Sequence, residues 1–240
     1  LLYSTIAMIA LSAVLLIIQF GFDVTLLKEN KTYLIIQIMS SFVIAFTAFF
    51  VRYMFEQFGK IKCLCVEDTE KMSNLLESDY ELIRRLQAFS ANLFIHSMRV
   101  SVMSMRVSQK MGYNSLLAKA GGMYHEIGRI KKEENYVEAT NDIAYAYDFP
   151  KCLTDLILQV CDKDEKPESR EAMVVMLSDS IVSMIEYFEK NTDKSRPSKE
   201  KLIESVFANR QKKGNFDNCD ISEKEIEGIK ETYKNINMDF

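Results

Sequence analysis

Two long stretches without a charged residue constrain what the first part of the chain can fold into. Residues 1–22 and 32–51 contain no Asp, Glu, Lys or Arg, and Asp23 and Arg52 end them. A helix crosses the apolar core of a bilayer in about 20 residues. A signal peptide is the alternative for the first stretch, but no basic segment precedes it, no small-residue cleavage site stands out, and the second stretch follows at once. The sequence therefore predicts a two-helix membrane hairpin over residues 1–52.

The rest of the chain has the pattern of a helical domain in contact with water. Charged residues appear every few positions, apolar residues recur at steps of three and four, and the whole chain has only 8 Gly and 3 Pro. No stretch alternates with a period of two for long, so we expect an all-α fold without a sheet. We expect a linker helix over residues 53–78 and a helical domain over residues 79–240.

Local signals predict where the helices of this domain begin and end. A helix over residues 95–111 is expected to stop at Gly112, and Asn114 or Ser115 is expected to cap the next one. Ser222 lies three residues before Glu225, which is a capping-box pattern for the last helix. The other expected helices cover residues 138–147, 151–160, 169–189 and about 195–214.

Charge and cysteine content exclude some classes of function. The formal net charge is −4, so no broad basic face is expected, and we predict no nucleic-acid polymer as a partner. The five cysteines form no CxxC pair, which argues against a disulfide framework or a zinc knuckle. Cys63 and Cys65 closely follow the second apolar stretch, where palmitoylation is the alternative to the unmodified thiols that we expect.

The only two histidines of the chain suggest a metal site. His125 is followed directly by Glu126, and Asp179 lies in an apolar stretch where a carboxylate is costly unless it is paired or binds a metal. Imidazoles and carboxylates suit Mn, Fe and similar divalent ions. A satisfied core histidine and a solvated glutamate are the alternatives. We interpret His96, His125, Glu126 and Asp179 as candidate ligands of one divalent metal ion.

Five segments in order resemble the HD superfamily of metal-dependent phosphohydrolases. Within it, the chain is most similar to the cytoplasmic HD domain of the seven-transmembrane HD receptors, bacterial membrane proteins that hydrolyse cyclic di-AMP. The segments are residues 75–96, His96-Ser97-Met98-Arg99-Val100, residues 114–130 with Tyr124-His125-Glu126-Ile127-Gly128, residues 171–180 and residues 214–222.

This resemblance carries expectations for fold, ligand and location. It implies that residues 79–240 are an HD-type helical domain and that the site holds a metal ion. It also implies a cyclic dinucleotide as the ligand and a bacterial inner (cytoplasmic) membrane location. The HD domain would then lie in the cytoplasm, which also suits reduced cysteines.

Departures from the family pattern bear on activity. The family has His-Asp where this chain has His125-Glu126, and it has lysine at the position of Arg129. Its insert with a further metal histidine is almost absent here, and its tandem histidines fall near Val160 and Cys161. The extra methylene of glutamate moves the carboxylate, and a misplacement of about 1 Å can lower a rate on the order of a hundredfold. The remaining ligands suffice for one metal ion, without the two-metal clamp on attacking and leaving oxygens.

We therefore interpret the chain as a membrane-anchored, catalytically degenerate HD domain with a regulatory or ligand-binding role. The alternative is an active one-metal phosphohydrolase, a cyclic di-AMP phosphodiesterase with a metal-activated water as nucleophile. A third interpretation is a membrane scaffold that keeps the fold for stability alone. Four basic residues near the site are either phosphate-binding or ordinary surface charges: Arg99, Arg129, Lys131 and Lys132.

Overall fold

The computed structural model describes residues 66–162, 166–191, 193, 195 and 197–237, together with Phe46 and Phe50. The chain divides into two compact units, Leu1–Cys63 and Leu64–Phe240. Apart from the two phenylalanines, the predicted membrane hairpin and the first part of the predicted linker lie outside the described residues. None of the described helices is long and apolar enough to cross a membrane.

All regular structure in the described part of the second unit is helical, as the sequence predicted, and no strand occurs there. The helices, in order, are α4 (Val66–Leu75), α5 (Glu81–Phe89), α6 (Ala91–Met111), α7 (Ser115–Tyr124), the 3-10 helix η1 (Ile127–Lys131), α8 (Tyr136–Ala146), α9 (Lys151–Cys161), α10 (Arg170–Lys190), α11 (Lys199–Lys212) and α12 (Glu223–Asn235).

Helix ends follow the capping signals in the sequence. α6 ends at Gly112, which has a positive φ of 73° that glycine adopts without a steric penalty. The side chain of Asn114 accepts a hydrogen bond from the Leu117 amide and caps α7. Ser169 and Ser222 cap α10 and α12 in the same way. These predicted boundaries are confirmed.

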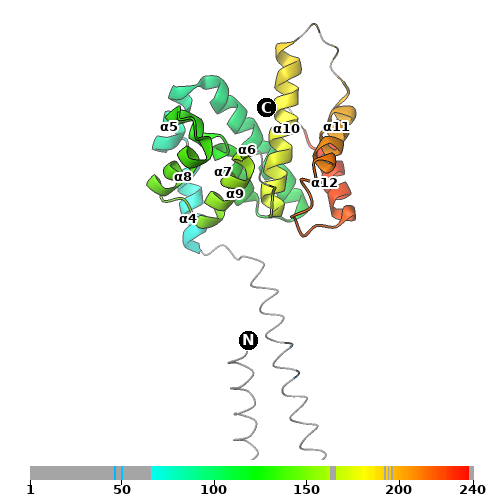
Figure 1. Ribbon diagram of the computed structural model, residues 1–240, viewed down its shortest axis with the longest axis horizontal. Helices are drawn as coiled ribbons and strands as arrows, with labels where there is room; N and C mark the ends of the chain where they lie inside the picture. The colour runs from blue at the N-terminus through cyan, green and yellow to red at the C-terminus, as the bar shows by residue number, and fades with distance from the viewer. Residues whose placement is uncertain are drawn as a thin grey trace, which may run out of the picture. The chain divides into compact units, whose positions relative to one another are not determined.

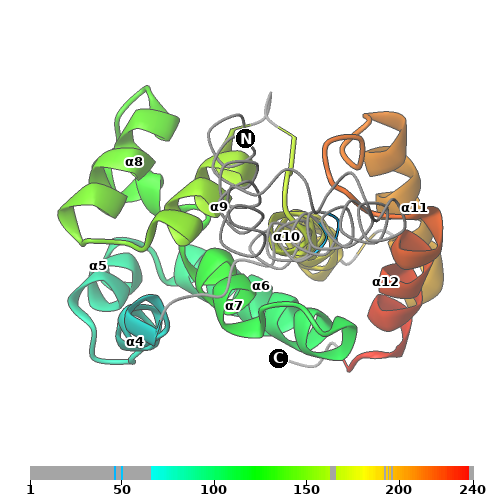
Figure 2. The same ribbon diagram turned by 90° about the horizontal axis from the view of Figure 1, so that it is seen from below.

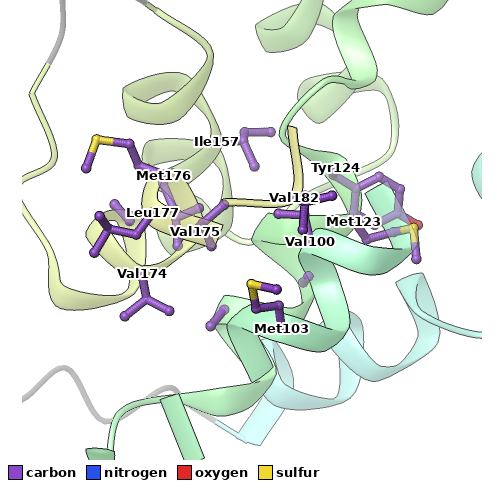
Figure 3. Packing of buried hydrophobic residues seen from close by; sticks show 14 of the residues in the cluster. Val100, Met103, Met123, Tyr124, Ile157, Val174, Val175, Met176, Leu177 and Val182 are labelled. Atoms are coloured by element: carbon purple, nitrogen blue, oxygen red, sulfur yellow. The ribbon is translucent and has the colours of Figure 1, made fainter. Parts of the chain in front are cut away.

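The long helix α10 lies at the centre of the unit. It packs against α6, α7, α9 and α11, and the two views show it between the α4–α9 group and the α11–α12 pair (Figures 1 and 2). Its apolar side chains, such as Val174, Val175 and Leu177, are completely buried, and Val100 and Met103 of α6 belong to the same core (Figure 3). This burial fixes the rotation of α10 and so determines where Asp179 points.

α6 and α7 approach one another closely at small residues. A Cβ atom at Gly122 would lie 2.6 Å from the backbone Cα of Ser101, which is closer than real Cβ contacts. The Ser101 hydroxyl donates a hydrogen bond of 2.7 Å to the carbonyl of Lys119. This close contact sets the relative position of His96 on α6 and His125 after α7.

Helices at the two ends of the unit are tied to the same core. Met72 and Leu75 of α4 are buried, and the Tyr124 hydroxyl donates to the Leu75 carbonyl. α4, which we expected as part of a linker helix, therefore packs on the domain. On the other side, the hydroxyl of buried Tyr233 in α12 donates to the Val174 carbonyl of α10 at 2.8 Å.

Candidate metal centre

His125 is held with one ring nitrogen aimed at the candidate site. It follows the last residue of α7, and its Nδ1 lies 2.9 Å from the Gly122 carbonyl oxygen. A carbonyl can only accept, so Nδ1 carries the proton and donates it. Nε2 is buried without a hydrogen-bond partner and lies 3.7 Å from Asp179 Oδ1. A buried, partnerless nitrogen lone pair beside a carboxylate fits a metal ligand.

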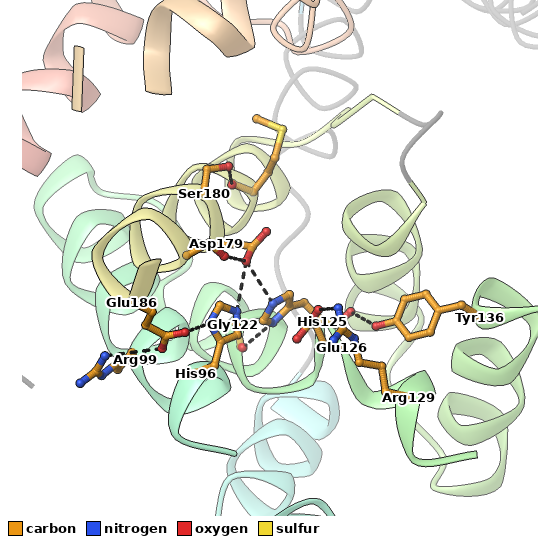
Figure 4. A network of polar contacts seen from close by, with 12 residues as sticks. His96, Arg99, Gly122, His125, Glu126, Arg129, Tyr136, Asp179, Ser180 and Glu186 are labelled. Carbon is orange, nitrogen blue, oxygen red and sulfur yellow. Dashed lines mark hydrogen bonds and ion pairs between the residues drawn. The ribbon is translucent and has the colours of Figure 1, made fainter. Parts of the chain in front are cut away.

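His96 bridges two carboxylates of α10. Its Nε2 lies 3.1 Å from Asp179 Oδ1 and its Nδ1 lies 3.2 Å from Glu186 Oε2 (Figure 4). Burial lowers the pKa of His96, but the hydrogen bond to Asp179 and the charges of both carboxylates outweigh burial, and the net pKa is raised. Without a metal ion, both ring nitrogens therefore act as donors. Glu186 holds Nδ1–H, so the Nε2 side is the one that can face an ion.

Asp179 is the acidic residue at the meeting point of the two imidazoles. Its Oδ1 also accepts a hydrogen bond of 3.2 Å from the Ser183 hydroxyl, one turn later on α10. Burial alone would raise its pKa, yet the nearby imidazoles of His125 and His96, the latter also through its hydrogen bond, hold the pKa of this carboxyl well below its ordinary value. Asp179 is therefore ionised and available to a cation.

Glu126 completes the group from the side of η1. One ligand atom each from His96, His125 and Glu126 can be chosen so that all three lie within 4.8 Å of one another. The Glu126 carboxylate forms an ion pair with Arg129, and the nearby Tyr136 hydroxyl donates to the His125 carbonyl at 3.1 Å. These contacts fix the backbone and the carboxylate on this side of the site.

The four predicted metal-site residues thus come together from three parts of the chain. Two imidazoles and two carboxylates form a donor set that suits Mn²⁺, Fe²⁺ or a similar ion. His96, His125 and Glu126 could bind a metal ion, with Asp179 between the imidazoles. The partnerless Nε2 of His125 is the observation that fits such an ion best.

A cavity of about 1020 Å³ opens beside this centre. Of the four basic residues predicted to bind phosphate, only one lines this cavity. Arg129 lines it together with His125, Glu126 and Asp179. The others make contacts elsewhere: Arg99 pairs with Glu189 at 2.8 Å, Lys131 pairs with Asp142 at 2.8 Å, and the Lys132 ammonium lies 5.6 Å from the centre of the Phe89 ring.

Several polar residues of this region were not predicted from the sequence. Glu186 orients His96, and Lys166, Arg210, Lys213 and Asn215 line the cavity. Glu186 follows Asp179 by seven residues, which is two helical turns and places both on one face of α10. That spacing could have identified Glu186. Arg210 carried no comparable local signal, and Asn215 stood out only as part of the segment 214–222 that resembles the HD superfamily.

Comparison with known proteins agrees with this geometry. The HD domain family model matches residues 93–184, which contain His96, His125, Glu126 and Asp179. This part of the chain is an HD domain, and the resemblance to the HD superfamily is confirmed.

The relatives include the cyclic-di-AMP phosphodiesterase PgpH of Bacillus subtilis, which is 21% identical over 216 residues. That match covers 68% of this chain, and the chain spans about 30% of the length of PgpH. The HD domain of Listeria monocytogenes PgpH, solved in complex with cyclic-di-AMP, matches with a TM-score of 0.56 and 20% identity, covering 64% of this chain and 93% of that structure. Ribonuclease Y of Aster yellows witches'-broom phytoplasma is 29% identical over 99 residues, 40% of this chain and 19% of its own length.

Replacing Glu186 with glutamine should lower metal affinity without removing a candidate ligand. Partners of the second ring nitrogen of a ligating histidine typically contribute 10–100-fold to metal affinity. We expect Glu186→Gln to weaken Mn²⁺ binding by about that factor in a direct titration of the purified chain. Glu189→Gln is the matched control, because Glu189 lies on the same helix as Glu186 and accepts a hydrogen bond from Arg99 of α6. Equal affinities for both variants would refute a role for Glu186 in orienting His96.

The raised pKa of His96 predicts a pH dependence of metal binding. Because the protonated imidazole is favoured, one of the two histidines of the metal-free protein should titrate above the ordinary value of about 6.5. A metal ion needs the Nε2 lone pair and competes with that proton, so apparent Mn²⁺ affinity should rise with pH through this range. Nuclear magnetic resonance of the imidazole protons, assigned with His96→Gln, measures the titration. A His96 resonance that titrates below the ordinary value would contradict this prediction.

Proposed function

We propose that this chain is a membrane-anchored HD-domain protein of the bacterial cytoplasmic membrane that binds one divalent metal ion and a cyclic dinucleotide. We further propose that it has a regulatory or ligand-binding role and has lost efficient hydrolysis. The uncharged stretches at residues 1–22 and 32–51 support the membrane anchor. The similarity to PgpH, whose HD domain was solved with cyclic-di-AMP, supports the class of ligand.

The grouping of His96, His125 and Glu126, with Asp179 beside both imidazoles and the Nε2 of His125 left without a hydrogen-bond partner, carries this proposal. A divalent ion held there, Mn²⁺ or Fe²⁺, would place positive charge against a phosphate oxygen and lower the pKa of a water molecule. Other residues of the chain orient the ligands and add charge to the cavity. Glu186 and the Gly122 carbonyl orient the two imidazoles, and Arg129 brings a positive charge to the cavity wall.

Two other residues of the cavity lining support the loss of a second metal ion. Val160 and Cys161, where the family resemblance places further histidines, line the same cavity. Burial raises the pKa of the Cys161 thiol to about 11, so it stays protonated at neutral pH, whereas a metal ligand must be a thiolate. With only two histidines in the chain, no imidazole can take these places.

An active one-metal phosphohydrolase is the second candidate function. It is favoured by the group of His96, His125 and Glu126 with Asp179 beside the imidazoles, and by the volume of the adjoining cavity, which is large enough for a small-molecule substrate. In this case His96, His125, Glu126 and Asp179 keep the same roles, and turnover persists in spite of the longer side chain of Glu126.

Cyclic di-AMP binding and hydrolysis by the purified full chain, with and without Mn²⁺, distinguish these functions. We expect Mn²⁺-dependent binding of cyclic di-AMP, with turnover no higher than that of His125→Ala. Turnover well above that variant would establish the phosphohydrolase and overturn the loss of hydrolysis. Absence of both metal and nucleotide binding would leave only a scaffold role.

A further inference from the structure

The cavity lining includes a second set of polar residues besides the candidate metal ligands. His125, Glu126 and Asp179 line one part, and Lys166, Arg210, Lys213 and Asn215 belong to the same lining. At about 1020 Å³, the cavity is at the upper end of the range for small-molecule sites, which is about 300–1000 Å³. A ligand that only covered the metal ion would leave most of this space unused.

Arg210 presents a guanidinium group next to the metal centre. Its Nε and Nη2 both donate to the Ser180 hydroxyl, at 3.1 and 2.6 Å, and Ser180 directly follows Asp179 on α10. No carboxylate lies within ion-pair distance of Arg210 among the described residues. Burial lowers its pKa, yet arginine stays charged. Its remaining N–H groups can therefore bind an anion in the cavity.

Asn215 supplies a buried acceptor without a partner. It is 8% exposed, it lines the cavity, and its Oδ1 accepts no hydrogen bond. The turn after α11 fixes it there, because Gly214 has φ of 67° and the Asn215 amide donates to the Arg210 carbonyl at 3.0 Å. A buried acceptor of this kind is costly unless a ligand or water donates to it.

We propose that Arg210, Lys213 and Asn215 form a second subsite that binds a phosphate group together with an N–H donor of the ligand. This inference rests on the proposed function and adds to it the residues that hold the second half of the dinucleotide. A dinucleotide with two phosphates has one phosphate at the metal centre and the other at Arg210 and Lys213. An amino group of its second nucleotide donates to Asn215. A mononucleotide reaches only one of the two subsites.

Titration of the full chain with cyclic di-AMP and with AMP, both in the presence of Mn²⁺, tests the second subsite. Arg210→Gln should weaken cyclic di-AMP binding about tenfold or more, because a hydrogen-bonded charge contact is lost, and should change AMP binding less than about twofold. Lys213→Gln, at an exposed position that tolerates substitution, should weaken cyclic di-AMP binding in the same direction. Lys212→Gln, which removes the same charge from an exposed position outside the cavity lining, should leave both affinities unchanged.

Binding of inorganic pyrophosphate to the metal-free protein tests the second subsite independently of the proposed binding of a metal ion and a cyclic dinucleotide. Pyrophosphate should bind the metal-free wild type and lose affinity in Arg210→Gln, whether or not cyclic di-AMP binds. Asn215→Ala should weaken cyclic di-AMP binding but leave pyrophosphate binding unchanged, because pyrophosphate has no N–H donor. Wild-type affinities in Arg210→Gln and Lys213→Gln for both probes, or no pyrophosphate binding by the wild type, would overturn the second subsite.

Discussion

Replacing Asp179 with asparagine is expected to lower the affinity for Mn²⁺ by more than about 100-fold, beyond the range found when only the outer partner of a ligand is lost. Asp179 Oδ1 lies 3.1 Å from His96 Nε2 and 3.7 Å from His125 Nε2, so it is the anionic group between the two imidazoles. Asparagine keeps the size of the side chain but removes the charge. Direct titration with Mn²⁺ and metal analysis after dialysis measure the effect.

Asp142→Asn is the control for this experiment. Asp142 pairs with Lys131 on the surface and takes no part in the candidate metal centre. We expect Mn²⁺ affinity in this variant to equal that of the wild type. If Asp179→Asn retained affinity within about twofold of Asp142→Asn, the metal centre would not be where these residues meet.

The second large effect concerns stability. Gly122→Ala should lower the free energy of unfolding by about 3 kcal/mol, at the upper end of the usual cost of overpacking a core. The new Cβ would lie 2.6 Å from Ser101 Cα and 2.7 Å from Ser101 N, and backbone atoms of α6 cannot rotate away. Chemical denaturation followed by circular dichroism measures this loss.

A second glycine-to-alanine change controls for the general effect of this substitution in a helix. Gly228 lies inside α12, where a Cβ would meet only the end of the Met111 side chain at 3.6 Å. Gly228→Ala should stabilise the protein by about 0.5–1 kcal/mol, because alanine favours helix more than glycine does. If both variants changed stability in the same direction, the close contact between α6 and α7 would not explain the cost at Gly122.

Most of the fold of residues 66–237 could be predicted from the sequence, because helix ends depend on local chemistry. Gly112, Asn114, Ser169 and Ser222 terminate or cap helices as their residue types indicate. The packing of α4 was not predicted. Its apolar residues at three- and four-residue steps are typical of both a free-standing linker and a docked helix, and only tertiary contacts distinguish the two.

The candidate site was predictable to a smaller extent. Local sequence cannot reveal that His96, His125 and Asp179 meet, since they lie on different helices, and the ordered resemblance to the HD superfamily supplied that link. The prediction that Arg99, Lys131 and Lys132 bind phosphate rested only on their closeness in sequence to the histidines. In the structure these residues contact acids or an aromatic ring, whereas Arg210 reaches the cavity from α11.

The number of metal ions per chain tests the central claim most directly. The purified full chain, saturated with Mn²⁺ and then freed of excess metal, should contain one ion per chain by elemental analysis, and His125→Ala should contain none. This result follows from the single group of His96, His125 and Glu126 with Asp179 beside the imidazoles, and from the absence of imidazoles at Val160 and Cys161. Two ions per wild-type chain, or one ion retained by His125→Ala, would contradict the one-metal centre.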